Sequence, residues 1–255
     1  MIEILSYDDS RLDAFCRRTE HQLRSEDGCF VAESPDIIQK ALAAGCIPVC
    51  ALTQKEASFP CPTYYVSKAL LSRMPGYSKT GGVLCLMKRP PLSAVDEILI
   101  GKRRIAVAEN MMNPTNLGSL FRSASALGVE ALLLTKGATD PYYRRCIRVS
   151  EGAVFSLPWA WIDPLPLGGI RQLRALGFQQ VAMALRQDSV ALSDPLLQSI
   201  PKLSIVLGTE EQGLCNETLA LCDHTVKIPM THGVDSLNVG AAAAVAFWAL
   251  CRLGE

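Results

Sequence analysis

The sequence predicts an α/β protein built in two parts, with a mainly parallel sheet in the larger C-terminal part. Short apolar runs alternate with helical patterns along the chain, which is the element order of α/β folds. Beyond Arg104 these runs are almost purely apolar, as in parallel strands that are covered on both faces. A Pro-Pro segment flanked by basic residues is the best domain boundary. We therefore expect an N-terminal α/β domain over residues 1–95, a linker over 96–104 and a C-terminal domain over 105–255.

Apolar runs in the N-terminal part predict strands over residues 30–32, 47–52, 64–66 and 83–87. A helix is predicted over 36–44, because Ser34-Pro35 provides a start signal and Gly45 a stop. A second helix is predicted over 67–73.

In the C-terminal part, apolar runs predict strands over residues 105–108, 131–134, 181–184, 203–207 and 226–228. A helix over 116–127 follows the first strand and stops at Gly128. The last stretch of the chain is the most informative. Pro229 ends the strand over 226–228, a polar loop follows, and an almost wholly apolar helix starts at Ser236. We expect this helix to be buried on all sides, with Ser236 or Asn238 as its cap.

The composition indicates a globular protein without a strong charge bias. Lys plus Arg and Asp plus Glu both number 25, so the basic excess of many nucleic-acid-binding proteins is missing. Any nucleic acid must therefore be held by local basic patches. No run of 18 charge-free apolar residues predicts a membrane span.

The ten cysteines do not form a recognisable framework. The N-terminus has neither a basic start nor a long apolar run, so we expect no secretory signal, free thiols and a cytoplasmic location. The set Cys215, Cys222, His224 and His232 has spacings that match no common zinc module, so no metal site is predicted.

Three stretches carry polar residues directly after predicted strands, where open α/β sheets bind ligands. The first, NPTNLGSLFRSA, places Asn116 at a helix start and Arg122 inside an otherwise apolar helix, where a buried guanidinium needs a partner. The second, IVLGTEEQGL, has the glycine spacing of a phosphate loop but lacks its Lys and Ser/Thr, which excludes a nucleoside-triphosphate site. The third, IPMTHGVDSLN, opens the last helix.

In this order and spacing, the three stretches closely resemble the motifs of the SpoU (TrmH-like) RNA 2′-O-ribose methyltransferases of the SPOUT superfamily. The resemblance covers about residues 103–252. It extends to an R-x-S-x-G-a-x-F segment that is carried by Arg148, Ser150, Gly152 and Phe155. The N-terminal part resembles, more weakly, the family's ribosomal-protein-like RNA-binding domain.

The resemblance implies a deep trefoil knot, a homodimer and S-adenosylmethionine bound largely by main-chain groups. It places the cofactor at Leu207, Gly208, Ile228, Met230 and Leu237. The polar active-site positions of the family fall on Asn116, Arg122, Glu210, Ser236 and Asn238. Candidate RNA contacts are Lys79, Lys88, Arg89, Arg103 and Arg148, with Lys102 and Arg104 beside them.

The implied reaction is methyl transfer to a ribose 2′-hydroxyl of structured RNA, either rRNA or tRNA. Arginine side chains are not deprotonated in proteins, so we expect Arg122 to bind phosphate and stabilise alkoxide charge rather than act as a base. The sequence leaves the proton acceptor open, with an RNA phosphate and water as the candidates.

Other functions are compatible with the same residues. A non-catalytic RNA-binding or ribosome-assembly factor is the main alternative, and an α/β enzyme acting on a small molecule is another. Ser236 and Asn238 also suit plain helix capping, and the basic residues near the boundary also suit a solvated surface.

Overall fold

The computed structural model describes residues 2–74, 82–186, 188–209, 211–231 and 236–251. It divides the chain into two compact units. Unit 1 comprises residues 1–91 and 142–155, and unit 2 comprises residues 92–141 and 156–255. Residues 96–104, the expected linker, belong to unit 2, and residues 142–155 belong with the N-terminal part of the chain.

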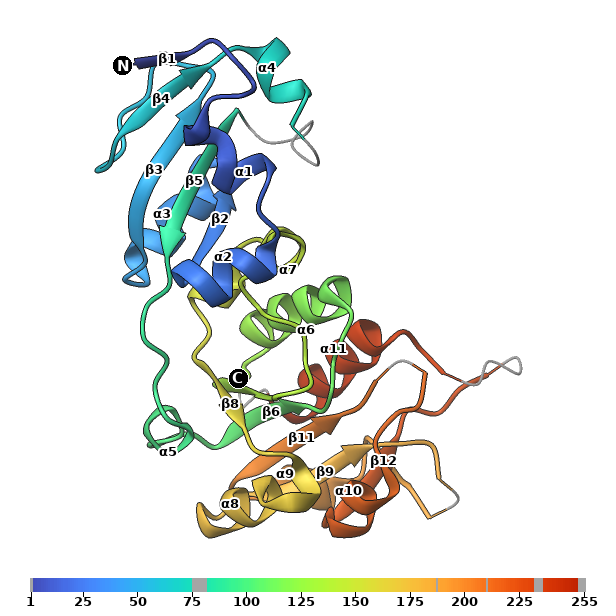
Figure 1. Ribbon diagram of the computed structural model, residues 1–255. Coiled ribbons are helices and arrows are strands. Elements are labelled where there is room, and N and C mark those ends of the chain that lie inside the picture. The colour runs from blue at the N-terminus through green and yellow to red at the C-terminus, as the bar shows by residue number, and fades with distance from the viewer. Residues whose placement is uncertain (1, 75–81, 187, 210, 232–235, 252–255) are drawn as a thin grey trace. The chain divides into compact units, whose positions relative to one another are not determined.

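Unit 1 is built on a five-stranded mixed sheet with the order β1-β4-β3-β5-β2 (Figure 1). β4 pairs in parallel with β1 and β3, whereas β5 pairs antiparallel with β2 and β3. The strands are β1 (Ile2–Ile4), β2 (Cys29–Glu33), β3 (Ile47–Thr53), β4 (Thr63–Val66) and β5 (Val83–Lys88). The helices are α1 (Asp13–Cys16), α2 (Glu20–Asp27), α3 (Pro35–Ala43), α4 (Lys68–Ser72) and α7 (Arg144–Val149), with 3₁₀ turns at Ser10–Leu12 and Ala153–Phe155.

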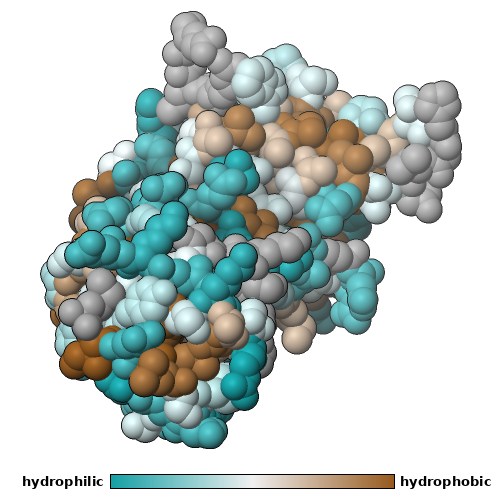
Figure 2. Space-filling model, turned by 90° about the horizontal axis from the view of Figure 1, so that it is seen from above, coloured by the Kyte–Doolittle hydropathy of each residue, from teal (hydrophilic) through white to brown (hydrophobic). Residues whose placement is uncertain are grey.

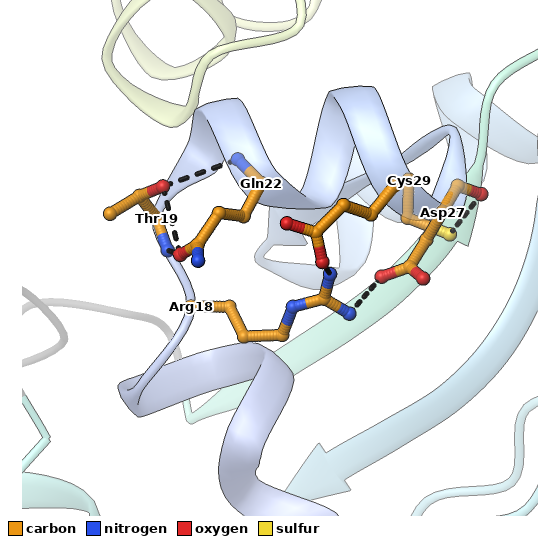
Figure 3. A network of polar contacts seen from close by, with 6 residues as sticks. Arg18, Thr19, Gln22, Asp27 and Cys29 are labelled. Carbon is orange, nitrogen blue, oxygen red and sulfur yellow. Dashed lines mark hydrogen bonds and ion pairs between the residues drawn. The ribbon is translucent and has the colours of Figure 1, made fainter.

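The predicted strands and helices of this part are present, with ends that differ by at most one residue. The predicted start of α3 is confirmed, since Ser34 is its N-cap and Pro35 its first residue, although Ser34 has a φ of 76° and its side chain makes no capping hydrogen bond. Helix α2, which the sequence did not predict, has a full capping box between Thr19 and Gln22. Figure 3 shows this box and Arg18, which pairs with Asp27 at the other end of the helix.

Residues 142–155 complete the core of unit 1, although they are distant from it in sequence. Tyr142 stacks on Phe30 with ring centroids 5.0 Å apart, and both rings lie 5.7 Å from Phe155. Arg144 in α7 forms an ion pair with the buried Glu33 at 2.5 Å. The segment is therefore tied to β2 by aromatic contacts and by charge.

Unit 2 contains a seven-stranded sheet with the order β10-β12-β9-β11-β6-β7-β8, and all its described pairs are parallel. This confirms the α/β class and the mainly parallel sheet. The strands are β6 (Arg104–Ala108), β7 (Ala131–Thr135), β8 (Trp159–Ile162), β9 (Gln179–Met183), β10 (Val190–Ala191), β11 (Leu203–Leu207) and β12 (His224–Lys227). The helices are α5 (Val95–Ile98), α6 (Pro114–Ala126), α8 (Gly169–Ala175), α9 (Pro195–Ser199), α10 (Asn216–Leu221) and α11 (Val239–Leu250), with a 3₁₀ turn at Leu165–Leu167.

Helices cover both faces of this sheet. Figure 1 shows α6 and α11 on one face, and α8 and α10 on the other. Ile105 and Val107 of β6 point into a buried apolar cluster that includes Leu173 of α8. Such double cover explains why the strand sequences are almost continuously apolar.

Two predictions for the last helix are wrong. α11 begins at Val239, not at Ser236, because Asn238 is its N-cap and accepts a hydrogen bond from the Gly240 N–H at 2.9 Å. The helix is also not buried on all sides, since Val245 is 41% exposed and Trp248 57% exposed. Uniformly apolar residues give no signal for which helix face points outward, so the sequence did not reveal this exposed face.

Exposed apolar residues also occur elsewhere on the surface. The face drawn in Figure 2 shows hydrophobic side chains in separate patches among hydrophilic ones. Exposed apolar surface is normal on globular proteins.

Gly240 has a packing role that its sequence position did not explain. A Cβ added there would lie 3.0 Å from Cβ of Ser119 in α6. α6 and α11 therefore pack closely at this point because position 240 has no side chain.

Arg104 is a structural residue, and the prediction that it contacts RNA phosphate is wrong. It is 4% exposed. Its guanidinium donates to the carbonyl oxygens of Leu250 at 3.0 Å and Pro201 at 3.1 Å. Burial lowers the pKa of Arg104 from its ordinary value. The side chain thus ties the end of α11 to the start of β6 and to the chain that precedes β11.

We expect Arg104→Met to lower the free energy of unfolding by about 3 kcal/mol, because it leaves buried carbonyl groups without donors. Urea unfolding measures this change. Arg103→Met is the matched control, since Arg103 is exposed, and we expect it to stay within about 0.5 kcal/mol of the wild type. Equal effects of the two substitutions would contradict the role of Arg104.

Candidate active site

A cavity of about 670 Å³ lies in unit 2, beside the carboxyl ends of β9, β11 and β12. Its volume is in the range of about 300–1,000 Å³ that is typical of small-molecule sites. Its position follows the rule that parallel α/β sheets bind ligands beyond the carboxyl ends of their strands. Because the three strands are neighbours in the sheet, loops distant in sequence meet around one space.

All five residues predicted to bind a cofactor line this cavity. They are Leu207, Gly208, Ile228, Met230 and Leu237. Ser236 and Asn238, predicted for the active site, line it as well. The structure therefore brings the second and third stretches together, and the binding roles of these residues stay predictions.

The turn after β11 presents main chain to the cavity. A Cβ added at Gly208 would lie 2.1 Å from the carbonyl carbon of Gly213 and 2.4 Å from the nitrogen of Leu214. Thr209 and Gly213 exchange two backbone hydrogen bonds, of 3.0 and 3.1 Å. The turn is thus closed on itself, and no side chain fits at position 208.

A pair of asparagines joins the first stretch to the third. The Asn238 Nδ2 donates to Asn116 Oδ1 at 3.2 Å. Asn116 is 8% exposed and lies near the start of α6, which begins at Pro114 with Asn113 as its cap. Asn238 therefore caps α11 and also lines the cavity, so the capping and active-site interpretations are compatible.

Arg122 is placed differently from the sequence prediction. It is exposed on α6 and is not one of the described residues that line the cavity. Of the two interpretations that the sequence left open, a buried guanidinium with a partner and a solvent-facing one on an amphipathic helix, the structure agrees with the second. Glu210 and Lys79 lie outside the described residues. The adjacent Glu211 lines the cavity.

The family model for the SpoU rRNA methylase family matches residues 103–248 of this chain. The chain belongs to the SpoU rRNA methylase family. This confirms the resemblance that the three stretches indicated, and the matched range contains the sheet, the cavity and the asparagine pair.

Individual relatives of this SpoU family member are named as RNA methyltransferases. An uncharacterized tRNA/rRNA methyltransferase of Mycobacterium bovis is 32% identical over 99% of this chain and 92% of its own length. A 23S rRNA (uridine-2′-O)-methyltransferase of Streptomyces viridochromogenes is 31% identical over 64% of this chain and 57% of its own length.

Solved structures match the whole SpoU chain. An RNA 2′-O ribose methyltransferase is 27% identical, with a TM-score of 0.81 and 98% of both chains covered. An AdoMet-bound rRNA methyltransferase of Sinorhizobium meliloti is 24% identical, with a TM-score of 0.85, 97% of this chain and 96% of that chain covered. At that identity, the second match shows the fold alone.

The RNA contacts predicted for this SpoU chain differ in exposure. Lys88, Arg103 and Arg148 are exposed. Arg89 is partly buried, because its Nε donates to the Cys29 carbonyl at 3.4 Å and its guanidinium lies 5.0 Å from the Tyr142 ring centroid. Arg89 therefore has a structural role in unit 1 in addition to any RNA contact.

The sequence did not single out Glu109, which binds the chain that follows the glycine turn of the cavity. It is 4% exposed. Its carboxylate accepts the Thr218 hydroxyl at 2.5 Å and the Cys215 N–H at 3.1 Å. Its own N–H donates to the Leu207 carbonyl at 2.8 Å. The signal was an acidic residue directly after a buried strand, where a charge needs partners.

The thiols of the SpoU chain are all free. Burial raises the pKa of Cys222 to about 12, which keeps this thiol protonated.

Within the described ranges, no group of three or more His, Cys, Asp or Glu is arranged to hold a metal. None of the described helices is long and apolar enough to cross a membrane.

We expect Glu109→Ala to speed amide hydrogen exchange at residues 213–218 about thirtyfold, because the Cys215 N–H and the Thr218 hydroxyl lose their acceptor. Glu109→Gln keeps one acceptor oxygen and is expected to have a smaller effect. Glu217→Ala is the control, because Glu217 is exposed and lies in α10 beside Thr218. Unchanged exchange in Glu109→Ala would show that the carboxylate does not hold this end of the turn.

Proposed function

We propose that this chain transfers a methyl group from S-adenosylmethionine to a ribose 2′-hydroxyl of structured rRNA or tRNA. Family membership and the 2′-O-methyltransferases among its relatives support this function. The observation that carries it is the cavity itself. The glycine turn forms one side of it, and Asn238, bonded to Asn116, forms another.

The residues around the cavity fit the proposed cofactor. Leu207, Ile228 and Leu237 supply apolar surface for an adenine ring, and the turn at Gly208 supplies main-chain groups. Charged side chains of both signs also line the cavity, as a zwitterionic amino-acid group requires. When bound, S-adenosylmethionine supplies an electrophilic methyl group on a sulfonium.

The chain's own contribution is mainly to position the ribose. Asn238 lines the cavity, and its amide is fixed by the bond to Asn116 and by the cap of α11, so it is prepared to orient the hydroxyl, with Asn116 as its support. Holding reactants in line lowers a barrier by several kcal/mol. Ser236 adds a hydroxyl at the same cavity.

Arg122 acts on the RNA rather than inside the cavity. Arg122 is an exposed residue of α6, and a guanidinium is suited to bind a phosphate through two N–H groups. In this role it holds the RNA in place for the reaction. The proton leaves to an RNA phosphate or to water.

We further propose that the C-terminal part contains the family's trefoil knot. Two observations support it. The sheet order is far from sequence order, since β11 lies between β6 and β9. The main chain around Gly208 and at the α6–α11 contact approaches its neighbours closely, as a threaded chain requires.

Unit 1 is the proposed RNA-binding domain, corresponding to the predicted domain over residues 1–95. Lys88 and Arg148 are its exposed basic candidates, and Arg103 is the candidate in unit 2. Phosphate contacts by such side chains fix the orientation of an RNA. An RNA substrate and free thiols both fit a cytoplasmic location.

The proposed homodimer uses the exposed side of α11. Ala241, Val245 and Trp248 follow one another at helical spacing, and Leu237 precedes them with 39% exposure. A second copy of the chain brings an identical apolar stripe, as a two-fold interface requires. The stripe begins beside the cavity, so the interface lies next to the site.

We expect the double change Val245→Glu and Trp248→Glu to convert a dimer into a monomer, because it places charges within the buried interface. Sedimentation velocity measures the change. Leu167→Glu, at another exposed apolar residue (80% exposed), is the control and should remain dimeric. A wild-type monomer, or a dimer that persists in the double variant, argues against this interface.

For the reaction, we expect labelled S-adenosylmethionine to methylate unmodified total RNA, with a product that ribonuclease destroys. Arg122→Ala should abolish methylation and leave cofactor affinity within a few fold, because Arg122 lies outside the cavity lining. Arg171→Ala, an exposed change in α8, is the control.

Each other outcome has a distinct meaning. Cofactor binding without methylation of any RNA favours a non-catalytic RNA-binding factor. A ribonuclease-resistant product favours a small-molecule substrate. Loss of cofactor binding in Arg122→Ala refutes the phosphate role. Mapping 2′-O-methyl groups in RNA from cells with and without this chain identifies the target nucleotide.

A further inference from the structure

The loop after β9 forms part of the cavity wall and has a defined backbone on either side of Gln187, which lies outside the described residues. Ala184, Leu185 and Arg186 line the cavity. The hydroxyl of Ser189 donates to the Ala184 carbonyl at 2.9 Å and accepts the Arg186 N–H at 3.1 Å. Ser189 is 7% exposed, so this bridge is shielded from water and fixes the backbone of Arg186 at the cavity.

The side chain of Arg186 already holds a carboxylate. Its Nε lies 3.1 Å from Oδ1 of Asp188, and this hydrogen bond lowers the pKa of Asp188. The two side chains are 46% and 68% exposed. Exposed ion pairs between near neighbours contribute little to stability. The Asp188 carboxylate is therefore easily replaced by one from a ligand.

Among the described charged residues that line the cavity, Arg186 is better suited to a carboxylate than Lys227. Glu211 carries the wrong charge. Lys227 lies within β12 and offers a single point charge on a flexible stem. The guanidinium of Arg186 is a planar fork that matches both oxygens of a carboxylate.

We propose that Arg186 binds the α-carboxylate of the methyl donor, and that Asp188 occupies this position on the guanidinium when the donor is absent. The inference rests on the proposed function, because it requires S-adenosylmethionine in the cavity. It assigns Asp188 as an internal competitor for the same cation. Removing Asp188 therefore has the opposite effect from removing Arg186.

The test compares two donors that differ only in this group, S-adenosylmethionine and decarboxylated S-adenosylmethionine. Calorimetry on the full chain measures the affinity of each. We expect the wild type to prefer S-adenosylmethionine about tenfold, as for a hydrogen bond to a charged group. Arg186→Ala should remove this preference because it lowers the affinity for S-adenosylmethionine and not the affinity for the decarboxylated donor. Arg186→Lys, which keeps the charge but not the fork, should restore part of it.

Asp188→Asn should raise the affinity for S-adenosylmethionine a few fold and leave the affinity for the decarboxylated donor unchanged. Arg171→Ala controls for the loss of one positive charge at a described residue outside the cavity lining and should keep the preference. Thermal unfolding of each variant confirms that the fold is intact, as expected for exposed positions.

Several results would overturn the assignment. If Arg186→Ala weakens the binding of both donors equally, Arg186 does not bind the carboxylate. If Lys227→Ala removes the preference instead, Lys227 binds it. If Arg186→Ala leaves the affinity for both donors unchanged but raises the KM for RNA, Arg186 contacts an RNA phosphate instead. A wild type that binds both donors equally refutes this inference alone, whereas one that binds neither refutes the proposed function as well.

Discussion

The close contact of main chain with main chain at the glycine turn after β11 is the constraint on which the site depends. Position 208 has no room for a Cβ, since the backbone of Gly213 and Leu214 occupies that space. The turn is therefore closed by main chain on main chain at a point that lines the cavity. Glu109 holds the far end of the turn through Cys215 and Thr218, so the tight geometry is supported from the neighbouring strand.

A second contact extends this arrangement to the helices. Asn238 uses its side-chain oxygen to cap α11 and its side-chain nitrogen to reach Asn116. The bond requires α6 and α11 to lie close together, and Gly240 permits this beside Ser119. Three stretches that are distant in sequence thus share one site because small residues stand at the points of closest approach.

Most strands and the parallel sheet were predictable because each left a local pattern, and the cavity-lining residues were predictable from the resemblance of three stretches to family motifs. Apolar runs marked the strands, and glycine and asparagine marked the turns that follow them. Properties that depend on orientation were not predictable. In the sequence Arg122 stands among apolar residues and Arg104 follows two basic ones, yet Arg122 is exposed and Arg104 is buried. The partners that decide this for Arg104, the carbonyls of Leu250 and Pro201, are about 100 residues or more away. Glu109 was missed for the same reason.

Residues 142–155 lie in unit 1, although unit 2 precedes and follows them in the chain. The polypeptide therefore passes between the units three times, after residues 91, 141 and 155. A gene fragment that stops at the Pro-Pro segment encodes Phe30 and Glu33 without Tyr142 and Arg144, which contact them. Exchange of this part between relatives must transfer two separate coding segments at once, and a single crossover leaves an aromatic surface and a buried carboxylate without their complements.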